Sequence, residues 1–179
     1  MPSYHTYLIS SLPMLHFSIK PPFSFGRFME ICQDLIPEEE LTVLKKSSLV
    51  EEAIPKNFHP TLKRWHAFDV ALRNELVKIR AGRKHIEPAK YLRQDGFVEP
   101  AVSHLAMNAA RNPSLLEAER MLDLERWRML DELAAGHYFD LDFLIVYARK
   151  LLILERWERI RSADKAKALE AVLQKDNKN

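Results

Sequence analysis

The sequence predicts an all-α protein, and three of its features support this prediction. The 179-residue chain has only four glycines, so few positions suit the tight hairpin turns of an all-β fold. Apolar residues recur every three or four positions over the long segments, which is typical of helices with one buried face. All three tryptophans follow a leucine, a charged residue and an arginine. We expect an irregular multi-helix bundle built around a long antiparallel helical hairpin, with a single helical domain over residues 1–162 and a C-terminal helix with a frayed tail over residues 163–179.

In the first part of the chain we expect short elements that prolines separate. Residues 4–12 fit either a strand or the first turns of a helix, and periodicity does not separate the two. Ser24 is placed to cap a helix that runs to about Ile36. Pro37 and the three glutamates after it fit the first turn of another helix, because acids favour the positive end of the helix dipole. Residues 47–58 are expected to form a linker or a weak helix.

The first long helix is expected to open at Pro60 and to run to about Gly82, which can serve as its C′ residue. Its apolar positions step by three or four, as one buried helical face requires. Two short helices are expected after it, near residues 88–93 and 100–110.

Two further long helices form the expected hairpin. Asn112 and Pro113 fit the cap and first position of one arm, and Gly136 fits its end. Asp140 is placed to cap the other arm, which is apolar almost all round from residue 143 to 154 and should therefore lie centrally. The connection between the arms is short, so they must run antiparallel.

The tryptophan pattern predicts helices that pack in similar ways. Trp65, Trp127 and Trp157 are expected in the core, and the hexapeptide that ends at Trp127 recurs, with one change, 30 residues on. That echo fits an internal repeat or a chance reuse of the same residues. The arginine before each tryptophan is expected to be solvated at the core's edge. Neighbours in a helix do not share a face, so any cation stacked on an indole ring should come from another helix.

Neither a catalytic motif nor a metal-binding motif is evident. The seven histidines include no His-x-x-x-His and no Glu-x-x-His pair, and no acid or cysteine completes a set with His59 and His66. The single cysteine, Cys32, excludes an intrachain disulfide and is expected to be a small core side chain. We therefore expect no enzyme activity, no catalytic residue, no metal and no cofactor. A group of carboxylates is expected to form a solvated face with local ion pairs: Glu117, Glu119, Asp123, Glu125, Asp131 and Glu132.

Charge is unevenly distributed along the chain although its net charge is only +2. Residues 63–84 carry seven Lys or Arg against two acids, and residues 112–142 carry eight acids against three arginines. We interpret this as attraction between the two helices or toward oppositely charged partners. The chain carries no recognisable signal peptide and no apolar run long enough to span a bilayer, so a cytoplasmic location is expected.

Several segments together resemble an uncharacterised bacterial family whose genes accompany those of V-type ATPase subunits. That family is similar to a short V-type ATPase C subunit, the d subunit of eukaryotes. The segments that carry the resemblance are Tyr4–Pro13, Leu72–Leu76 with Arg80–Ala81, Leu122–Trp127, Leu130–Leu133, His137–Asp140 and Lys150–Trp157.

The resemblance implies an all-helical, non-catalytic subunit, peripheral to a membrane complex, whose partners are the central stalk and the membrane ring. In the larger C subunit, three similar helical units form a funnel that seats the rotor shaft on the membrane ring. This chain is too short for three such units, so a structural role and an accessory role both remain open. The residues expected to matter for the scaffold or for interactions are Trp65, Arg73, Asn74, Arg80, Trp127, His137, Tyr138 and Trp157.

Two other classes of function are alternatives. A helical regulator could bind nucleic acid through the basic segment 78–84, with Lys78, Arg80, Arg83 and Lys84. An enzyme would require a deep pocket lined by titratable groups with perturbed pKa values. Nucleic acid and small-molecule substrates are not the expected partners.

Overall fold

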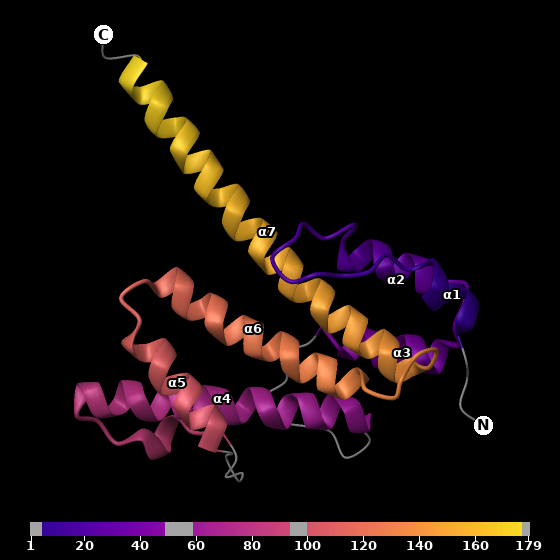
Figure 1. Cartoon of the computed structure of the whole chain (residues 1–179), viewed down its shortest axis with the longest axis horizontal. Helices are drawn as coiled ribbons and strands as arrows, with labels where there is room; N and C mark the ends of the chain where they lie inside the picture. The colour runs from indigo at the N-terminus through magenta and orange to yellow at the C-terminus, as the bar shows by residue number, and fades with distance from the viewer. Residues whose placement is uncertain (1–4, 49–58, 94–99, 177–179) are drawn as a thin grey trace.

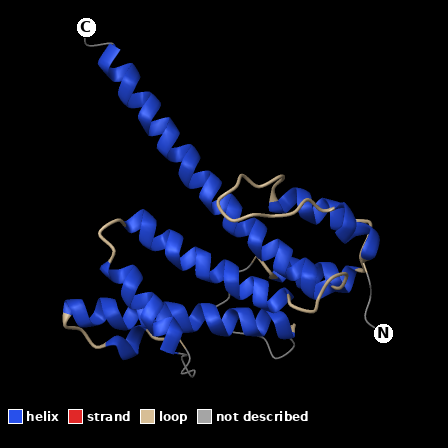
Figure 2. Cartoon of the chain, in the orientation of Figure 1, coloured by secondary structure: helices blue, strands red, loops and turns tan. Residues whose placement is uncertain are grey.

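The computed structural model describes residues 5–48, 59–93 and 100–176, with side chains described as far as residue 164. Within these residues the chain forms helices and loops and contains no strand (Figure 2), which confirms the all-α prediction. The helices are α1 (Thr6–Ser11), α2 (Phe25–Gln33), α3 (Glu38–Lys46), α4 (Pro60–Lys84), the short 3-10 helix η1 (Pro88–Tyr91), α5 (Pro100–Arg111), α6 (Leu115–Ala134) and α7 (Leu141–Asp176).

The ambiguous segment near the N-terminus is helical. Leu8 and Ile9 of α1 are consecutive and both buried, whereas a strand would turn neighbouring side chains to opposite faces. The Ser24 hydroxyl caps α2 as predicted, because it accepts a hydrogen bond from the backbone N–H of Arg27 at 3.1 Å. Pro37 precedes α3 at the cap position. Most of the expected linker, residues 49–58, lies outside the described residues.

The predicted end of α4 at Gly82 is wrong. The helix continues to Lys84, and His85 takes the left-handed conformation with φ of 53°. The N–H of His85 bonds to the Gly82 carbonyl and that of Ile86 to the Ala81 carbonyl, so the two form a Schellman motif around a histidine. Histidine adopts this backbone region more readily than most residues, which explains how it replaces glycine here.

The start of α6 also differs from the prediction. The helix begins at Leu115, and the Ser114 hydroxyl caps it by accepting from the N–H of Glu117 at 3.3 Å. Asn112 instead stabilises the preceding turn, where its side-chain oxygen accepts from the N–H of Ser114 at 2.9 Å. Beyond the last helical residue, Gly136 has φ of 85°, as expected for the residue that ends the helix.

Helix α7 is the central element of the bundle. Asp140 caps it as predicted, since its carboxylate accepts from the N–H of Phe143 at 3.2 Å. The five consecutive residues Leu144–Ala148 are all buried. Figure 1 shows α1 and α2 on one side of α7, with α6 and α4 on the other. The same helix continues unbroken to Asp176, so the segment from residue 163 is the end of α7 and not a separate helix.

Three apolar clusters hold these helices together. The first joins α1, α2 and α3 to α7, and the second joins α4 and α6 to α7. The third packs Leu72 of α4 against α5 and α6 through Val102, Ala106 and Leu122. Because α7 supplies side chains to two of the clusters, it connects the N-terminal helices to the rest of the bundle. None of the described helices combines the length and the apolar run that crossing a membrane requires.

Candidate functional site

The three tryptophans converge on one cluster, although they come from three helices. Trp65, Trp127 and Trp157 are 6%, 7% and 8% exposed, which confirms the predicted core position. We call this cluster the indole core. Its other buried members are Leu130, Leu133, Val146, Ile153 and Leu154.

A buried carboxylate lies beside the indole core. Asp123 is only 1% exposed, and one of its oxygens accepts a hydrogen bond from the Trp157 indole N–H at 2.9 Å. The other accepts from Arg126 at 2.8 Å, and an Arg156 nitrogen lies 3.2 Å from the same oxygen. The expectation that Asp123 belongs to a solvated face is therefore wrong. Its charge is instead compensated by two guanidinium groups and one indole N–H.

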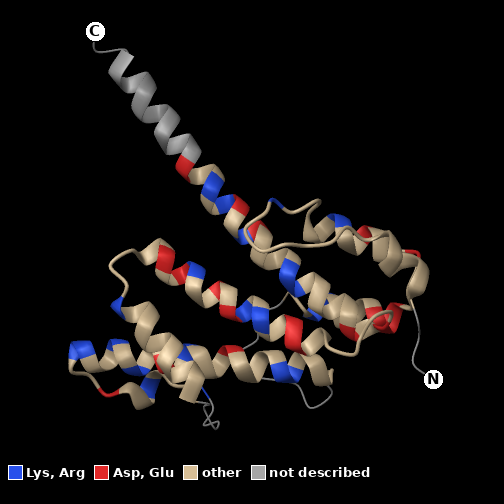
Figure 3. Ribbon diagram, in the orientation of Figure 1, with Lys and Arg blue, Asp and Glu red and all other residues tan. Residues whose placement is uncertain are grey.

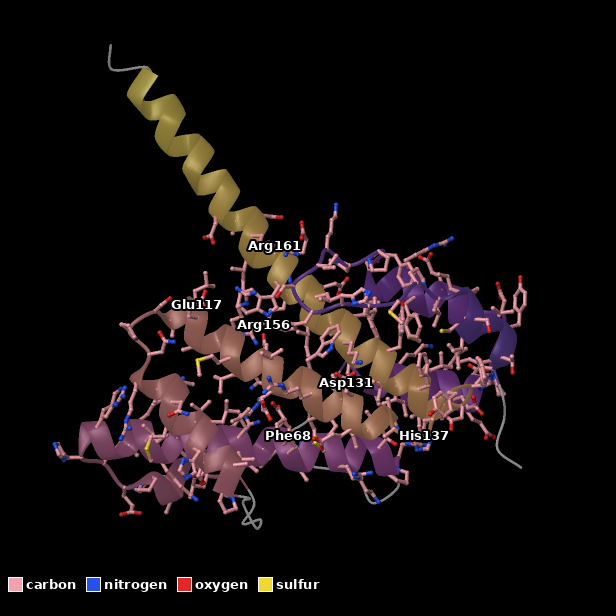
Figure 4. The ribbon with its side chains drawn as sticks, in the orientation of Figure 1. Phe68, Glu117, Asp131, His137, Arg156 and Arg161 are labelled. Carbon is pink, nitrogen blue, oxygen red and sulfur yellow. The ribbon has the colours of Figure 1, made fainter. Side chains whose placement is uncertain are left out.

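The ion pairs around Asp123 extend across three helices. Arg126 of α6 also donates to Asp69 of α4 at 2.9 Å, and Asp69 accepts from Arg73 at 2.7 Å. At the other end, Arg156 of α7 lies 2.5 Å from the Glu119 carboxylate of α6. Figure 4 shows Arg156 where α6 and α7 lie side by side. The network therefore links α4, α6 and α7.

Arg126, the arginine before the second tryptophan, is mostly buried, whereas the sequence predicted that it is solvated. The Arg126 side chain is only 12% exposed. Burial opposes its charged form, but the carboxylates of Asp69 and Asp123 outweigh that cost and raise the pKa of Arg126. Arg64, before the first tryptophan, is exposed as predicted.

The cations that stack on the indoles come from α7, a different helix from the rings they cover. The Arg149 guanidinium lies 5.7 Å from the Trp65 ring centre, and the Lys150 ammonium lies 5.0 Å from that of Trp127. This agrees with the expectation that a stacking partner must come from another helix.

The two similar hexapeptides differ at one position only, Asp123 against Ile153. Because α6 and α7 are antiparallel, Asp123 of the first meets the arginine and tryptophan of the second, Arg156 and Trp157. Ile153 lies in the indole core, where a carboxylate would have no such partners. The single difference between the hexapeptides therefore matches two different surroundings, a charged one for Asp123 and an apolar one for Ile153.

The glutamates of the two hexapeptides also differ in role. Glu125 pairs with Arg128 at 3.0 Å on the surface, which agrees with the local ion pairs expected of this face. The Glu155 carboxylate instead accepts from the backbone N–H of Phe25 at 2.9 Å. It therefore fixes the start of α2 against α7.

The remaining predicted residues have different surroundings. Asn74 is 7% exposed, and its side-chain amide donates to the Arg93 carbonyl at 2.6 Å and accepts from the Arg93 N–H at 2.9 Å. It holds the segment after η1 against α4. Arg80 is exposed, and Tyr138 is 70% exposed, so these two can act as interaction residues but not as core residues.

His137 lies in the turn between α6 and α7. Its Nδ1 is 2.6 Å from an Asp140 oxygen, and this hydrogen bond, with the charges of Asp142 and Asp140, raises the pKa of His137. Asp142 also accepts from the Thr61 hydroxyl, and His59 Nδ1 lies 3.7 Å from its carboxylate. Sequence spacing missed the approach of His59 and Thr61 to Asp142, because they come from a different element.

The ion pair that joins the basic helix α4 to the acidic helix α6 is the reverse of what their net charges suggested. The ion pair between these helices uses Asp69 of the basic helix and Arg126 of the acidic one. Two acids of α6 pair with cations of α7 instead, Asp131 with Lys150 and Glu119 with Arg156. The reason is that α7 packs along α6 and places its cations there.

The basic segment at the end of α4 is visible in Figure 3. Two of its four cations already have partners in the chain, because Lys78 pairs with Glu75 at 2.7 Å and Arg83 donates to the Ala110 carbonyl at 2.6 Å. A nucleic-acid surface here would have to compete with these contacts.

A mainly apolar cavity of about 490 Å³ lies between residues 12–17 and the α6–α7 hairpin. Leu15, Phe17, Trp127 and Tyr147 are among the residues that line it. Burial raises the pKa of the Tyr147 hydroxyl, which donates to the Pro13 carbonyl at 2.9 Å. This tyrosine is therefore a neutral anchor for the loop.

One family model matches the chain, over residues 101–175, and is described as a protein of unknown function, DUF2764. The matched region spans α5, α6 and most of α7, including Asp123 and the tryptophans of the hairpin. No curated protein and no solved structure matches the chain.

Proposed function

We propose that this chain is a non-catalytic structural or accessory subunit of a V-type rotary ATPase, which couples or positions the central stalk near the membrane ring. The Asp123 network is the observation that best supports the proposal. Buried ion pairs across α4, α6 and α7 restrict the relative movement of these helices, which suits a part that transmits or resists torque without performing a reaction. The hairpin that holds this network also contains most of the residues on which the resemblance to the C subunit depends.

The shape of α7 adds support for a role between partners. Its last turns extend beyond the other helices of the bundle (Figure 1). A helix that leaves the body of a protein can contact a second protein while its first half remains anchored in the core. Here the anchored half carries the buried run Leu144–Ala148.

Affinity purification of the tagged full-length chain from its native host tests the proposal. Subunits of the central stalk and the membrane ring should be enriched in the purified material. The variant Tyr138→Ala should reduce this enrichment severalfold, because Tyr138 is exposed at the hairpin turn. Tyr7→Ala is the matched control, since Tyr7 is 79% exposed on a different helix. Absence of every rotary ATPase subunit would contradict the proposal.

Binding to nucleic acid discriminates the proposal from the regulatory alternative. At physiological salt the protein should not be retained on DNA or RNA, because Lys78 and Arg83 of the basic segment already have partners within the chain. Strong, salt-sensitive retention that Arg80→Glu abolishes would favour the nucleic-acid function instead.

A further inference from the structure

Three side chains with metal-binding chemistry, those of His137, Asp140 and Asp142, meet where α7 begins, and a fourth, His59 before α4, approaches Asp142. His59 immediately precedes α4, His137 lies in the turn before α7, and Asp140 and Asp142 flank the first residue of α7. Figure 4 shows His137 at this junction, beside the first turn of α4. Nitrogen and carboxylate oxygen atoms of His137, Asp140 and Asp142 all lie within 4.8 Å of one another. Two separate segments, one before α4 and one at the start of α7, thus deliver imidazole and carboxylate groups to one place.

The distances around Asp142 fit two ligands of one ion better than they fit hydrogen bonds. His59 Nδ1 is 3.7 Å from one oxygen of Asp142, and His137 Nδ1 is 3.7 Å from the other. Both distances exceed the range of a hydrogen bond. Metal–nitrogen and metal–oxygen bonds of about 2.0–2.1 Å at a tetrahedral centre place neighbouring ligand atoms about 3.4 Å apart. Asp142 could therefore share an ion with His137, whereas His59, which lies outside the group of close ligand atoms, would have to move toward that ion.

His59 provides an independent reason to place a ligand here. Its Nδ1 atom is buried and makes no hydrogen bond within the described residues. An unsatisfied buried nitrogen destabilises the folded protein, and a bound cation would remove that cost. The same nitrogen lies 3.7 Å from an Asp142 oxygen, so the two atoms are near enough to share an ion.

The contacts behind the carboxylates resemble those that orient metal ligands. The Thr61 hydroxyl donates to Asp142, and Asp140 accepts from the N–H of Phe143. Such outer contacts fix a ligand's orientation before the ion arrives. The side chains of His59 and Asp142 are each 21% exposed, which leaves a route for an ion from solvent.

From this geometry we propose that His137, Asp140 and Asp142 bind one divalent transition-metal ion of the zinc class, with His59 moving in as the fourth ligand. Imidazole nitrogen with carboxylate oxygen favours such an ion over magnesium or calcium, which prefer oxygen alone. The positive charge of Arg64 acts on His137, so it opposes a cation and makes the site weaker than a closed structural zinc site. The metal would join the start of α4 to the hairpin turn.

Titration of the full-length protein with Co²⁺ as the probe tests the proposal. One equivalent should bind and produce the visible absorption bands of a four-coordinate nitrogen and oxygen site, and Zn²⁺ should displace it. His59→Gln and Asp142→Asn should each weaken binding by at least about tenfold, since even outer contacts contribute that much to metal sites. Arg64→Gln should strengthen binding severalfold. His104→Gln is the matched control, because His104 is exposed on α5, and it should leave binding unchanged.

Two results would overturn the proposal. One is no saturable Co²⁺ binding to the folded protein at any concentration that leaves it soluble. The other is binding that His59→Gln, Asp142→Asn and His104→Gln change equally, which would assign the ion to surface histidines. In either case the His137–Asp140 hydrogen bond and the capping of α7 would be the whole role of this group. Circular dichroism of each variant checks that the loss of binding is not a loss of folding.

Discussion

Asp123 links helices α6 and α7, a role that its position in the sequence does not suggest. It lies among five other acids of one segment that the sequence presents as a solvated face. What distinguishes it is the set of groups across the helix boundary, Arg156 and Trp157, which no local pattern reveals. The burial of the tryptophans was predictable because large apolar side chains at helical spacing are seldom left in water. The burial of the acid beside them was not, since two of its three partners are 33 and 34 residues away.

Replacing this carboxylate should destabilise the protein strongly. Asp123→Asn leaves Arg126 and Arg156 without their shared counter-ion, and breaking a buried pair typically costs about 3–5 kcal/mol. Glu125→Gln, which breaks an exposed pair, should cost less than about 1 kcal/mol. Urea unfolding followed by circular dichroism measures both. Equal effects of the two variants would show that the Asp123 network does not stabilise the bundle.

The single cysteine should be inert while the protein is folded. Cys32 is fully buried, and desolvation raises the pKa of its thiol to about 12. At pH 8 the thiolate that reacts with disulfide reagents is therefore almost absent. A thiol-reactive dye should label the native protein far more slowly than the urea-unfolded protein. Rapid labelling of the native state would mean that the cluster around α2 opens readily.

At the scale of the elements, the helices were more predictable than their ends. Apolar periodicity identified α4, α6 and α7, because one buried face leaves a repeat in the sequence. Their ends depend on single residues that compete for the cap. Ser114 caps α6 in place of Asn112, and His85 ends α4 in place of Gly82. The sequence offers two adequate candidates at each end, and only the path of the following chain decides between them.

Two glycine substitutions should have opposite effects. Gly82 lies inside α4 with open space around it, so Gly82→Ala should stabilise the protein by about 0.5–1 kcal/mol. Gly136 has φ of 85°, so Gly136→Ala should destabilise it by about 1 kcal/mol through backbone strain. Midpoints of thermal or urea unfolding report both. A destabilising Gly82→Ala would contradict the observed length of α4.

At the scale of the whole molecule, α7 is the common support of two halves. The same helix packs against α2 and α3 and against α4 and α6. The sequence indicated its central position, because residues 143–154 are apolar almost all round. The convergence of all three tryptophans, the Asp123 network and the histidine group at the hairpin turn could not be predicted. Each depends on the relative placement of helices far apart in the chain.

The central position of α7 predicts that its backbone amides exchange hydrogen more slowly than those of helices at the edge. Backbone amides of Leu144–Leu154 should be among the slowest in the protein to exchange with deuterated water, because opening them disrupts two apolar clusters at once. Amides of α1, a short helix at the edge, should exchange much faster. Hydrogen exchange followed by mass spectrometry resolves both. Faster exchange in α7 than in α1 would rule out a central supporting role for it.

Quantitative mass spectrometry of the V-type ATPase purified from the native host, through one of its own stalk subunits, tests the proposed role most directly. This chain should be present in a fixed ratio to the stalk subunits and should remain through a moderate salt wash. Its absence from the intact enzyme, with the free chain abundant in the same extract, would contradict the proposed role.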